Sequence, residues 1–193
     1  MTDRHHLWFL TDFGDQAVVL PLAVVMAAAL LFSGWRRGAL VWSIGVPATL
    51  LAVGFAKLLI FRFGSPAALP DLLSPSGHTA SAALVYGGLA AMMLRGTVPW
   101  RRALLGAVPL AVLIGGTRLA LGVHTPDDVV VGGLIGLAGA IGLAWFAGDR
   151  PHWISAWPPA AVMLIVFVLF HGIRLPAEAW LHAAAQSWQA GSL

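Results

Sequence analysis

Long apolar stretches separated by short charged segments constrain the fold of this chain more than any other feature. A helix needs about 20 apolar residues to cross roughly 30 Å of hydrocarbon. Stretches of that order cover residues 16–35, 38–56, 79–94, 103–117, 129–148 and 155–172. The sequence therefore predicts an all-α fold, a polytopic membrane helix bundle with about six transmembrane helices.

The composition supports a membrane protein and excludes several other classes. The 193 residues include 11 Lys or Arg and 8 Asp or Glu, and 59% are hydrophobic, whereas a soluble domain has about 25% charged residues. Disorder and a soluble globular fold are excluded, because so much apolar surface would face water. The arginines are scattered, so no nucleic-acid partner is expected. Cysteine is absent, which excludes disulfides and thiolate sites.

The segments outside these stretches are short, and residues 1–193 are expected to form a single membrane-embedded domain. Residues 5–14 and 176–190 are predicted to lie at the membrane interface. The first stretch is not expected to be a cleaved signal peptide, because Asp3, Asp12 and Asp15 precede it. The 22 glycines are interpreted as sites of close helix packing. These features indicate the lipid bilayer as a partner and leave the oligomeric state open.

Basic residues fall unequally on the two sides of the predicted bundle. One side collects Arg36, Arg37, Arg95, Arg101, Arg102 and Arg150, and the other collects Arg4, Lys57, Arg62, Arg118 and Arg174. Loops rich in Lys and Arg stay cytoplasmic. If Lys57, Arg62 and Arg118 are set aside as candidate site residues, the first side is cytoplasmic and both termini lie outside. The unusual polar residues then gather on the extracytoplasmic side, where ionisable groups in a membrane protein indicate function.

The segment Ser74-Pro75-Ser76-Gly77-His78 has the composition of a helix start that binds an anion. Ser74 can cap a helix, and Pro75 suits the first helical position. The amides of Ser76, Gly77 and His78 would then point outward at the positive end of the helix dipole, where phosphate binds favourably. The plainer interpretation is a helix start that happens to carry a histidine.

A second polar segment runs from Thr117 to Asp128. Thr125 as the cap and Pro126 as the first helical residue predict a helix start, with His124 within reach of the Asp128 carboxylate. A carboxylate bonded to one ring nitrogen fixes the tautomer and leaves the other nitrogen free to attack. The acid could instead serve only the helix dipole.

Arg118 lies six residues before His124, and its planar fork of donors matches phosphate oxygens. The plainer interpretation is an arginine at the membrane interface. Taken together, two histidines, an orienting acid, a phosphate-binding turn and several cations suggest phosphoryl transfer through histidine. No H-E-x-x-H metal motif occurs, although a metal site built from His78, His124 and Asp128 stays open as an alternative.

The segments Pro75-Ser76-Gly77-His78 and Arg118-x5-His124-x3-Asp128 resemble the second and third motifs of the type 2 phosphatidic-acid phosphatase superfamily. These helical membrane enzymes are related to the vanadium haloperoxidases. Thr117 replaces the serine that precedes the arginine of the third motif. The first motif, K-x6-R-P, departs further: counted from Lys57, Gly64-Ser65 stands where Arg-Pro is expected, and Arg62 lies two places away.

The resemblance implies a role for each matching residue. His124 would be the nucleophile that becomes a phosphohistidine, Asp128 would orient it, and His78 would act as general acid and then as base. Arg118, Ser76, Gly77, Lys57 and, as a substitute for the missing arginine, Arg62 would bind the phosphate. The resemblance implies a metal-independent phosphatase with no cofactor.

The expected substrate is a membrane lipid phosphate or pyrophosphate, of the undecaprenyl pyrophosphate, phosphatidylglycerol phosphate or lipid A phosphate type. The short chain resembles the compact bacterial undecaprenyl-pyrophosphate phosphatases, which implies the bacterial cytoplasmic membrane. Three alternatives remain: a lipid phosphotransferase using the same site, a membrane transporter, and a family member that binds without catalysis.

Overall fold

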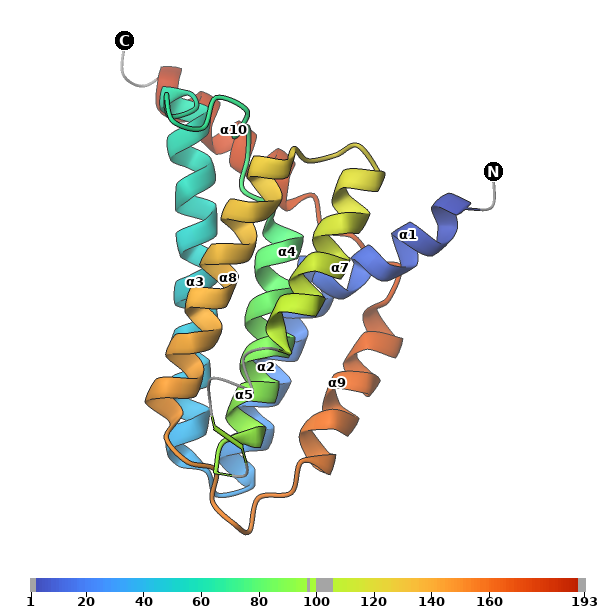
Figure 1. Cartoon of the computed structure of the whole chain (residues 1–193), viewed down its shortest axis with the longest axis vertical. Coiled ribbons are helices and arrows are strands. Elements are labelled where there is room, and N and C mark those ends of the chain that lie inside the picture. Colours follow the sequence, from blue (N-terminus) through green and yellow to red (C-terminus); the bar gives the residue numbers. More distant parts are fainter. Residues whose placement is uncertain (1–2, 97, 100–105, 191–193) are drawn as a thin grey trace.

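A computed structural model describes residues 3–96, 98–99 and 106–190, and over these residues the chain is a bundle of helices without a β-strand (Figure 1). Three segments are long and apolar enough to cross a membrane, namely Arg4–Phe32, Arg36–Phe63 and Pro126–Ala147. The helices Ala107–Ala120 and Trp157–Phe170 are apolar but shorter. The predicted all-α membrane bundle is confirmed, and the number of crossings stays a prediction.

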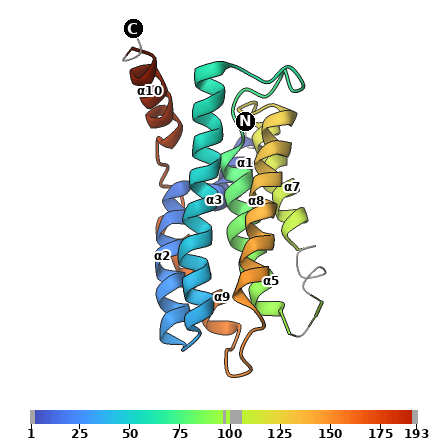
Figure 2. The same ribbon diagram turned by 90° about the vertical axis from the view of Figure 1, so that its left-hand side faces the viewer.

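The helices follow one another through short connections. Their bounds are α1 Asp3–Thr11, η1 Asp12–Gly14, α2 Gln16–Phe32, α3 Arg36–Phe63, α4 Gly77–Ala82, η2 Ala83–Gly87, α5 Gly88–Leu94, α7 Ala107–Ala120, α8 Pro126–Ala147, α9 Trp157–Phe170 and α10 Ala177–Ala190. The helices α3 and α8 lie side by side, with α4 and α5 against α8 (Figures 1 and 2). The helix α10 lies near the C-terminal end of α3 (Figure 1).

Several predicted spans differ from the observed helices in extent. The third, 79–94, is interrupted by the π-helical segment η2, and such segments often occur near functional sites. The second, 38–56, was predicted too short, because α3 continues through Lys57 to Phe63. Lys57 lies within this helix and pairs with Glu178. The start of the fourth, residues 103–105, lies outside the described residues.

Small residues on α8 allow the backbone of α4 to approach it closely. A Cβ atom added to Gly132 would overlap the backbone oxygen of Ser76, and one added to Gly136 would overlap that of Ala80. Gly142 faces open space. The stripe Gly132-x3-Gly136 is the arrangement that brings membrane helices together, and here it presses the Ser76 backbone against the start of α8.

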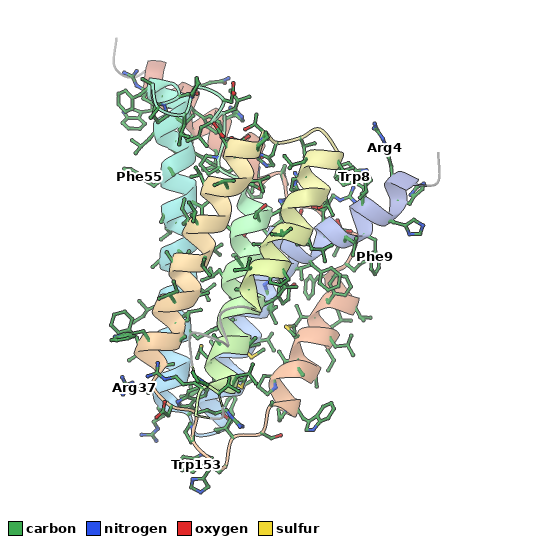
Figure 3. The ribbon with its side chains drawn as sticks, in the orientation of Figure 1. Arg4, Trp8, Phe9, Arg37, Phe55 and Trp153 are labelled. Carbon is green, nitrogen blue, oxygen red and sulfur yellow. The ribbon has the colours of Figure 1, made fainter. Side chains whose placement is uncertain are left out.

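The main apolar core lies between α2, α3 and the α4–α5 segment. Leu22, Met26, Trp42, Leu84 and Met92 are buried within it. The Trp42 indole donates a hydrogen bond to the backbone oxygen of Ala23 at 3.0 Å, which joins α3 to α2. Large apolar side chains on the outward faces stay exposed, as Phe55 shows on α3 (Figure 3). Such surfaces suit a lipid environment.

Basic residues collect at both ends of the bundle, as the alternation of spans predicts. Arg37 donates to the backbone oxygen of Phe146 at 2.8 Å, and Arg95 pairs with Asp149 at 2.9 Å at the same end. Arg4 lies at the opposite end from Arg37 (Figure 3). Arg101 and Arg102, which the prediction assigned to the Arg37 end, lie outside the described residues.

Candidate active site

The start of α8 brings together His124, the predicted nucleophile, and Asp128, the acid predicted to orient it. Thr125 caps α8 with its side chain, which accepts from the amide of Asp128 at 3.1 Å, and Pro126 is the first helical residue. The predicted cap is confirmed. His124 Nδ1 lies 3.2 Å from Asp128 Oδ2, and the two side chains are 2% and 3% exposed. The contact with the carboxylate leaves Nε2 of His124 as the nitrogen available to a substrate.

Asp128 also fixes the loop that precedes α4. Its Oδ1 accepts a hydrogen bond of 2.6 Å from the amide of Ser74, and its Oδ2 accepts one of 3.0 Å from the amide of Thr125. Its backbone oxygen accepts from the amide of Ser76 at 2.8 Å. A single buried residue therefore ties the start of α8 to the loop that leads into α4, the helix that carries His78.

The cap of α4 differs from the prediction. Ser76, not Ser74, is the cap residue, and its hydroxyl accepts from the amide of Thr79 at 3.4 Å. Pro75 is consequently outside the helix, and the Ser76 amide does not point outward because it bonds to Asp128. The Ser74 hydroxyl is unavailable as a cap because it bonds to Lys57 and Glu178. Gly77 and His78 are left to supply the amides of the first turn.

Lys57 belongs to a buried triangle with Ser74 and Glu178. Its Nζ donates to Ser74 Oγ at 2.7 Å and to Glu178 Oε1 at 3.0 Å, and Ser74 Oγ donates to the same carboxylate oxygen at 2.8 Å. The Lys57 side chain is 6% exposed and that of Glu178 45%. The carboxylate of α10 thus contacts both Lys57 and the loop before α4.

Arg118 extends into the same region from the last turn of α7. Its Nη1 donates to Thr11 Oγ1 at 3.1 Å, which joins α7 to α1. Its Nε is buried without a hydrogen-bond partner among the described residues. A buried guanidinium nitrogen with no acceptor is costly, so Arg118 retains donor capacity for an anion.

His78 faces the N-terminal part of the chain. Its Nε2 lies 3.4 Å from Asp15 Oδ2, and the two side chains are 22% and 5% exposed. Asp15 is the cap of α2, where its Oδ1 accepts from the amide of Ala17 at 2.8 Å. The two candidate catalytic histidines therefore have separate carboxylate partners.

A pocket of about 1090 Å³ runs from several of these polar groups to the outward face of the bundle. Its polar end is lined by Asp15, Lys57, Gly77, His78, Arg118, Arg174 and Glu178. Its apolar part runs between α2 and α3 and is lined by residues that include Leu20, Val24, Val46, Leu50 and Leu51. Ser76 and His124 are not among the lining residues, and the Ser76 side chain is fully buried.

Burial and neighbouring charges set the ionisation of the loop and α10 groups. Burial lowers the pKa of His124, and Lys57 and Arg118 lower it further. The hydrogen bond that His124 donates to the Asp128 carboxylate acts in the opposite direction and raises it. Burial alone would raise the pKa of Glu178, but the Lys57 ammonium and the bonds from Lys57 and Ser74 hold it below its ordinary value. Lys57 and Arg118 also act on His78, so both imidazoles share one pair of cations.

Not every predicted residue reaches the pocket. Arg62 does not line it, and its guanidinium lies over the ring of Phe63, 5.2 Å from the centroid. Among the described residues, no three or more His, Asp or Glu side chains form a group that could hold a metal ion. His78 and His124 are instead divided between Asp15 and Asp128.

Sequence reasoning missed Asp15, Glu178 and Thr11 as parts of the site. Asp15 stands before an apolar stretch, where an acid is ordinary as a helix cap, and Glu178 lies in a segment assigned to the interface. The one available signal was the charge of the two acids, and Glu178 in particular is an isolated acid between apolar neighbours.

The chain is similar to known proteins over most of its length. The family model described as the PAP2 superfamily matches residues 19–152. The chain is 29% identical over 180 residues to an uncharacterized 22.5 kDa protein in the cps region of Klebsiella pneumoniae, a match that covers 89% of this chain and 86% of the relative. No solved structure matches at a comparable significance. The matched range includes Lys57, His78, Arg118, His124 and Asp128 and excludes Asp15 and Glu178.

Proposed function

Because the chain belongs to the PAP2 superfamily, whose members are phosphatases, we propose that it hydrolyses a membrane lipid phosphate or pyrophosphate through a phosphohistidine at residue 124. The observation that carries the proposal is the His124–Asp128 pair, 3.2 Å apart and buried, beside a pocket with cations at one end and apolar walls beyond them.

In the first step, the lone pair of His124 Nε2 attacks phosphorus and the bond from phosphorus to the leaving oxygen breaks. The Asp128 carboxylate holds the proton on Nδ1 and stabilises the charge that develops on the ring. His78 donates a proton to the leaving oxygen, which contributes about 10²–10⁴-fold to such reactions. Lys57, Arg118 and the amide of Gly77 bind the non-bridging oxygens.

In the second step, water attacks the phosphohistidine. Neutral His78 takes a proton from the water, the phosphorus–nitrogen bond breaks, and inorganic phosphate leaves with His124 restored. His78 regains the proton it gave up in the first step, so the cycle is balanced. Fixed donors around the phosphoryl group stabilise both transition states, each by about 3–4 kcal/mol.

The shape of the pocket supports a lipid substrate. Along α2 the lining extends from Gln16 to Val24, and along α3 from Val46 to Leu58. At 1.5 Å per residue these segments measure roughly 12 Å and 18 Å. Val24 and Leu51 are 70% and 72% exposed, so the apolar part opens on the outward face. A lipid could therefore place its phosphate at Lys57 and its chain between α2 and α3.

Charge placement supports an extracytoplasmic site in the cytoplasmic membrane of a bacterium. The end of the bundle that carries Arg36, Arg37, Arg95 and Arg150 is the cytoplasmic end by the distribution of basic residues. The polar end of the pocket lies toward the other end, beside Lys57 and Arg118. A lipid phosphate or pyrophosphate at the outer headgroup level would reach it directly.

The test is phosphate release by the full-length protein in detergent, with EDTA, from undecaprenyl pyrophosphate, phosphatidylglycerol phosphate, phosphatidic acid and a lipid A phosphate. We expect release from at least one lipid, inhibition by vanadate, and loss of activity in His124→Ala and His78→Ala. His152→Ala is the matched control, because this histidine contacts Trp153 away from the pocket.

Full activity in both site variants would refute the proposal. Activity that is lost with EDTA and restored by Mg²⁺ would favour the metal alternative. Transfer of the phosphoryl group to an added lipid alcohol in place of water would identify a phosphotransferase.

A further inference from the structure

We propose that Asp15 is a positioning residue for His78, one that fixes the imidazole and favours its protonated form for transfer to the leaving oxygen. The inference rests on the proposed function, in which His78 is the general acid. Asp15 precedes the part of the chain that the family model matches, and it lies in no motif described above.

The Asp15 carboxylate is held rigidly, with one oxygen directed at His78. Its Oδ1 accepts from the amides of Ala17 at 2.8 Å and Leu175 at 3.3 Å. Its Oδ2 lies 3.4 Å from Nε2 of His78. The side chain is 5% exposed. Each carboxylate oxygen thus has its own role, one in capping α2 and the other in facing the imidazole.

The backbone next to Asp15 packs directly against the backbone of His78. A Cβ atom added to Gly14 would lie 2.9 Å from Cα and 3.0 Å from the carbonyl carbon of His78. Real Cβ atoms do not approach backbone so closely, so only glycine lets η1 lie against α4 here. This packing is independent of the ionic contact, and it fixes the distance between Asp15 and His78.

The charges around His78 explain why a carboxylate is needed. Burial lowers the pKa of His78 most, and the cations Arg118 of α7 and Lys57 of α3 lower it further. Asp15 raises this pKa but does not offset the other effects. The carboxylate of α8, Asp128, bonds to His124 and to Ser74. Gln16 of α2 is neutral and donates to Ser81 Oγ at 2.9 Å.

Asp15 therefore supplies the negative charge that faces an imidazole surrounded by cations. Its contact with Nε2 leaves Nδ1 as the nitrogen that can pass a proton to the leaving oxygen. The arrangement mirrors the contact between Asp128 and Nδ1 of His124, which leaves Nε2 to attack. The two carboxylates favour opposite tasks: Asp15 favours the protonated form of the acid, and Asp128 leaves a nitrogen free on the nucleophile.

The test compares Asp15→Asn with Asp12→Asn. Asparagine caps helices as well as aspartate does, so the first variant keeps the start of α2. Asp12 is the matched control, because it is a buried acid three residues before Asp15. It contacts Arg174 at 3.1 Å and His171 at 3.4 Å, and it does not contact His78. The measurement is kcat/KM, which reports the phosphorylation of the enzyme, for a lipid alkyl phosphate and for p-nitrophenyl phosphate, whose leaving oxygen needs no proton.

For Asp15→Asn we expect a loss of about 10²-fold or more on the alkyl phosphate, within the range of general acid catalysis, and a loss under about 10-fold on the aryl phosphate. The alkaline limb of the pH profile should move to lower pH, because the acid must be protonated to act. Asp12→Asn should keep the wild-type limb. Asp15→Glu should restore part of the shift.

Equal losses on the two substrates, or an unmoved alkaline limb in Asp15→Asn, would overturn the inference while the proposed function stands. A wild-type protein that hydrolyses neither substrate would overturn the proposed function itself. A His78→Ala variant whose losses do not depend on the leaving group would show that the acid is another residue.

Discussion

Replacing Asp128 by asparagine should abolish most activity, because an amide cannot reproduce the bonds of this carboxylate. The carboxylate accepts from the amide of Ser74 at 2.6 Å on one oxygen. Its other oxygen accepts from the amide of Thr125 at 3.0 Å and faces His124 at 3.2 Å. An asparagine has one oxygen and one NH₂ group to fill these two positions.

Either orientation of the amide leaves a backbone donor without an acceptor, at a cost of about 1–3 kcal/mol. If the NH₂ group faces His124, it donates to Nδ1 and moves the ring proton to Nε2, the nitrogen that must attack. If it faces Ser74, the loop before α4 must shift. Wrong-tautomer substitutions of this kind lower kcat by about 10⁴-fold, and we expect a loss of that order.

The assay is single-turnover phosphate release by the full-length protein, alongside thermal unfolding to confirm the fold. Asp127→Asn is the matched control, since Asp127 is also in the first turn of α8 and contacts neither His124 nor Ser74. It should lose only the interaction with the helix dipole, about 0.3–1 kcal/mol. Activity of Asp128→Asn within about 10-fold of wild type would refute this reasoning.

Three further predictions follow from the same geometry. Gly132→Ala should destabilise the protein by about 1–3 kcal/mol and lower its activity, because the added methyl group displaces the Ser76 backbone. Gly142→Ala, whose added methyl group meets no atom within 4 Å, should do neither. Equal melting temperatures for the two variants would contradict this prediction. His124 should titrate below the ordinary value of about 6.5, because its pKa is lowered by burial. The imidazole is then neutral and able to attack at pH values above its pKa, and activity is lost on acidification below it. An NMR titration midpoint of His124 above about 6.5 would contradict the lowered pKa. Glu178→Gln should strengthen inhibition by orthovanadate, because the carboxylate bonded to Lys57 must yield to phosphate; weaker inhibition would show that Glu178 assists binding.

The fold and the centre of the site could be predicted because both depend on local patterns. Apolar stretches of membrane length fix helices, and Thr125-Pro126 with an acid at Asp128 fixes both the start of α8 and the place of His124. The cap of α4 was assigned to Ser74 because serine and proline stand in a suitable order. Its hydroxyl instead bonds to Lys57 and Glu178. The bond to Glu178 spans 104 residues, and no local pattern contains it.

Asp15 and Glu178 were missed for the same reason. Both acids are ordinary in their own segments, and each becomes part of the site only when distant helices pack together. Arg62 shows the opposite error: its proximity to Lys57 in the sequence suggested a shared role, but it lies five residues further along α3, outside the pocket lining.

The most direct test of the mechanism is to locate the phosphoryl group on the enzyme during turnover. The His78→Ala variant is mixed with p-nitrophenyl phosphate and quenched in alkali. It should accumulate as the phosphorylated enzyme, because it lacks the base that activates water in the second step. Peptide mass spectrometry should then find the phosphoryl group on His124, and the double variant with His124→Ala should carry none. Phosphate on any other residue, or turnover by His124→Ala at the wild-type rate, would contradict the account.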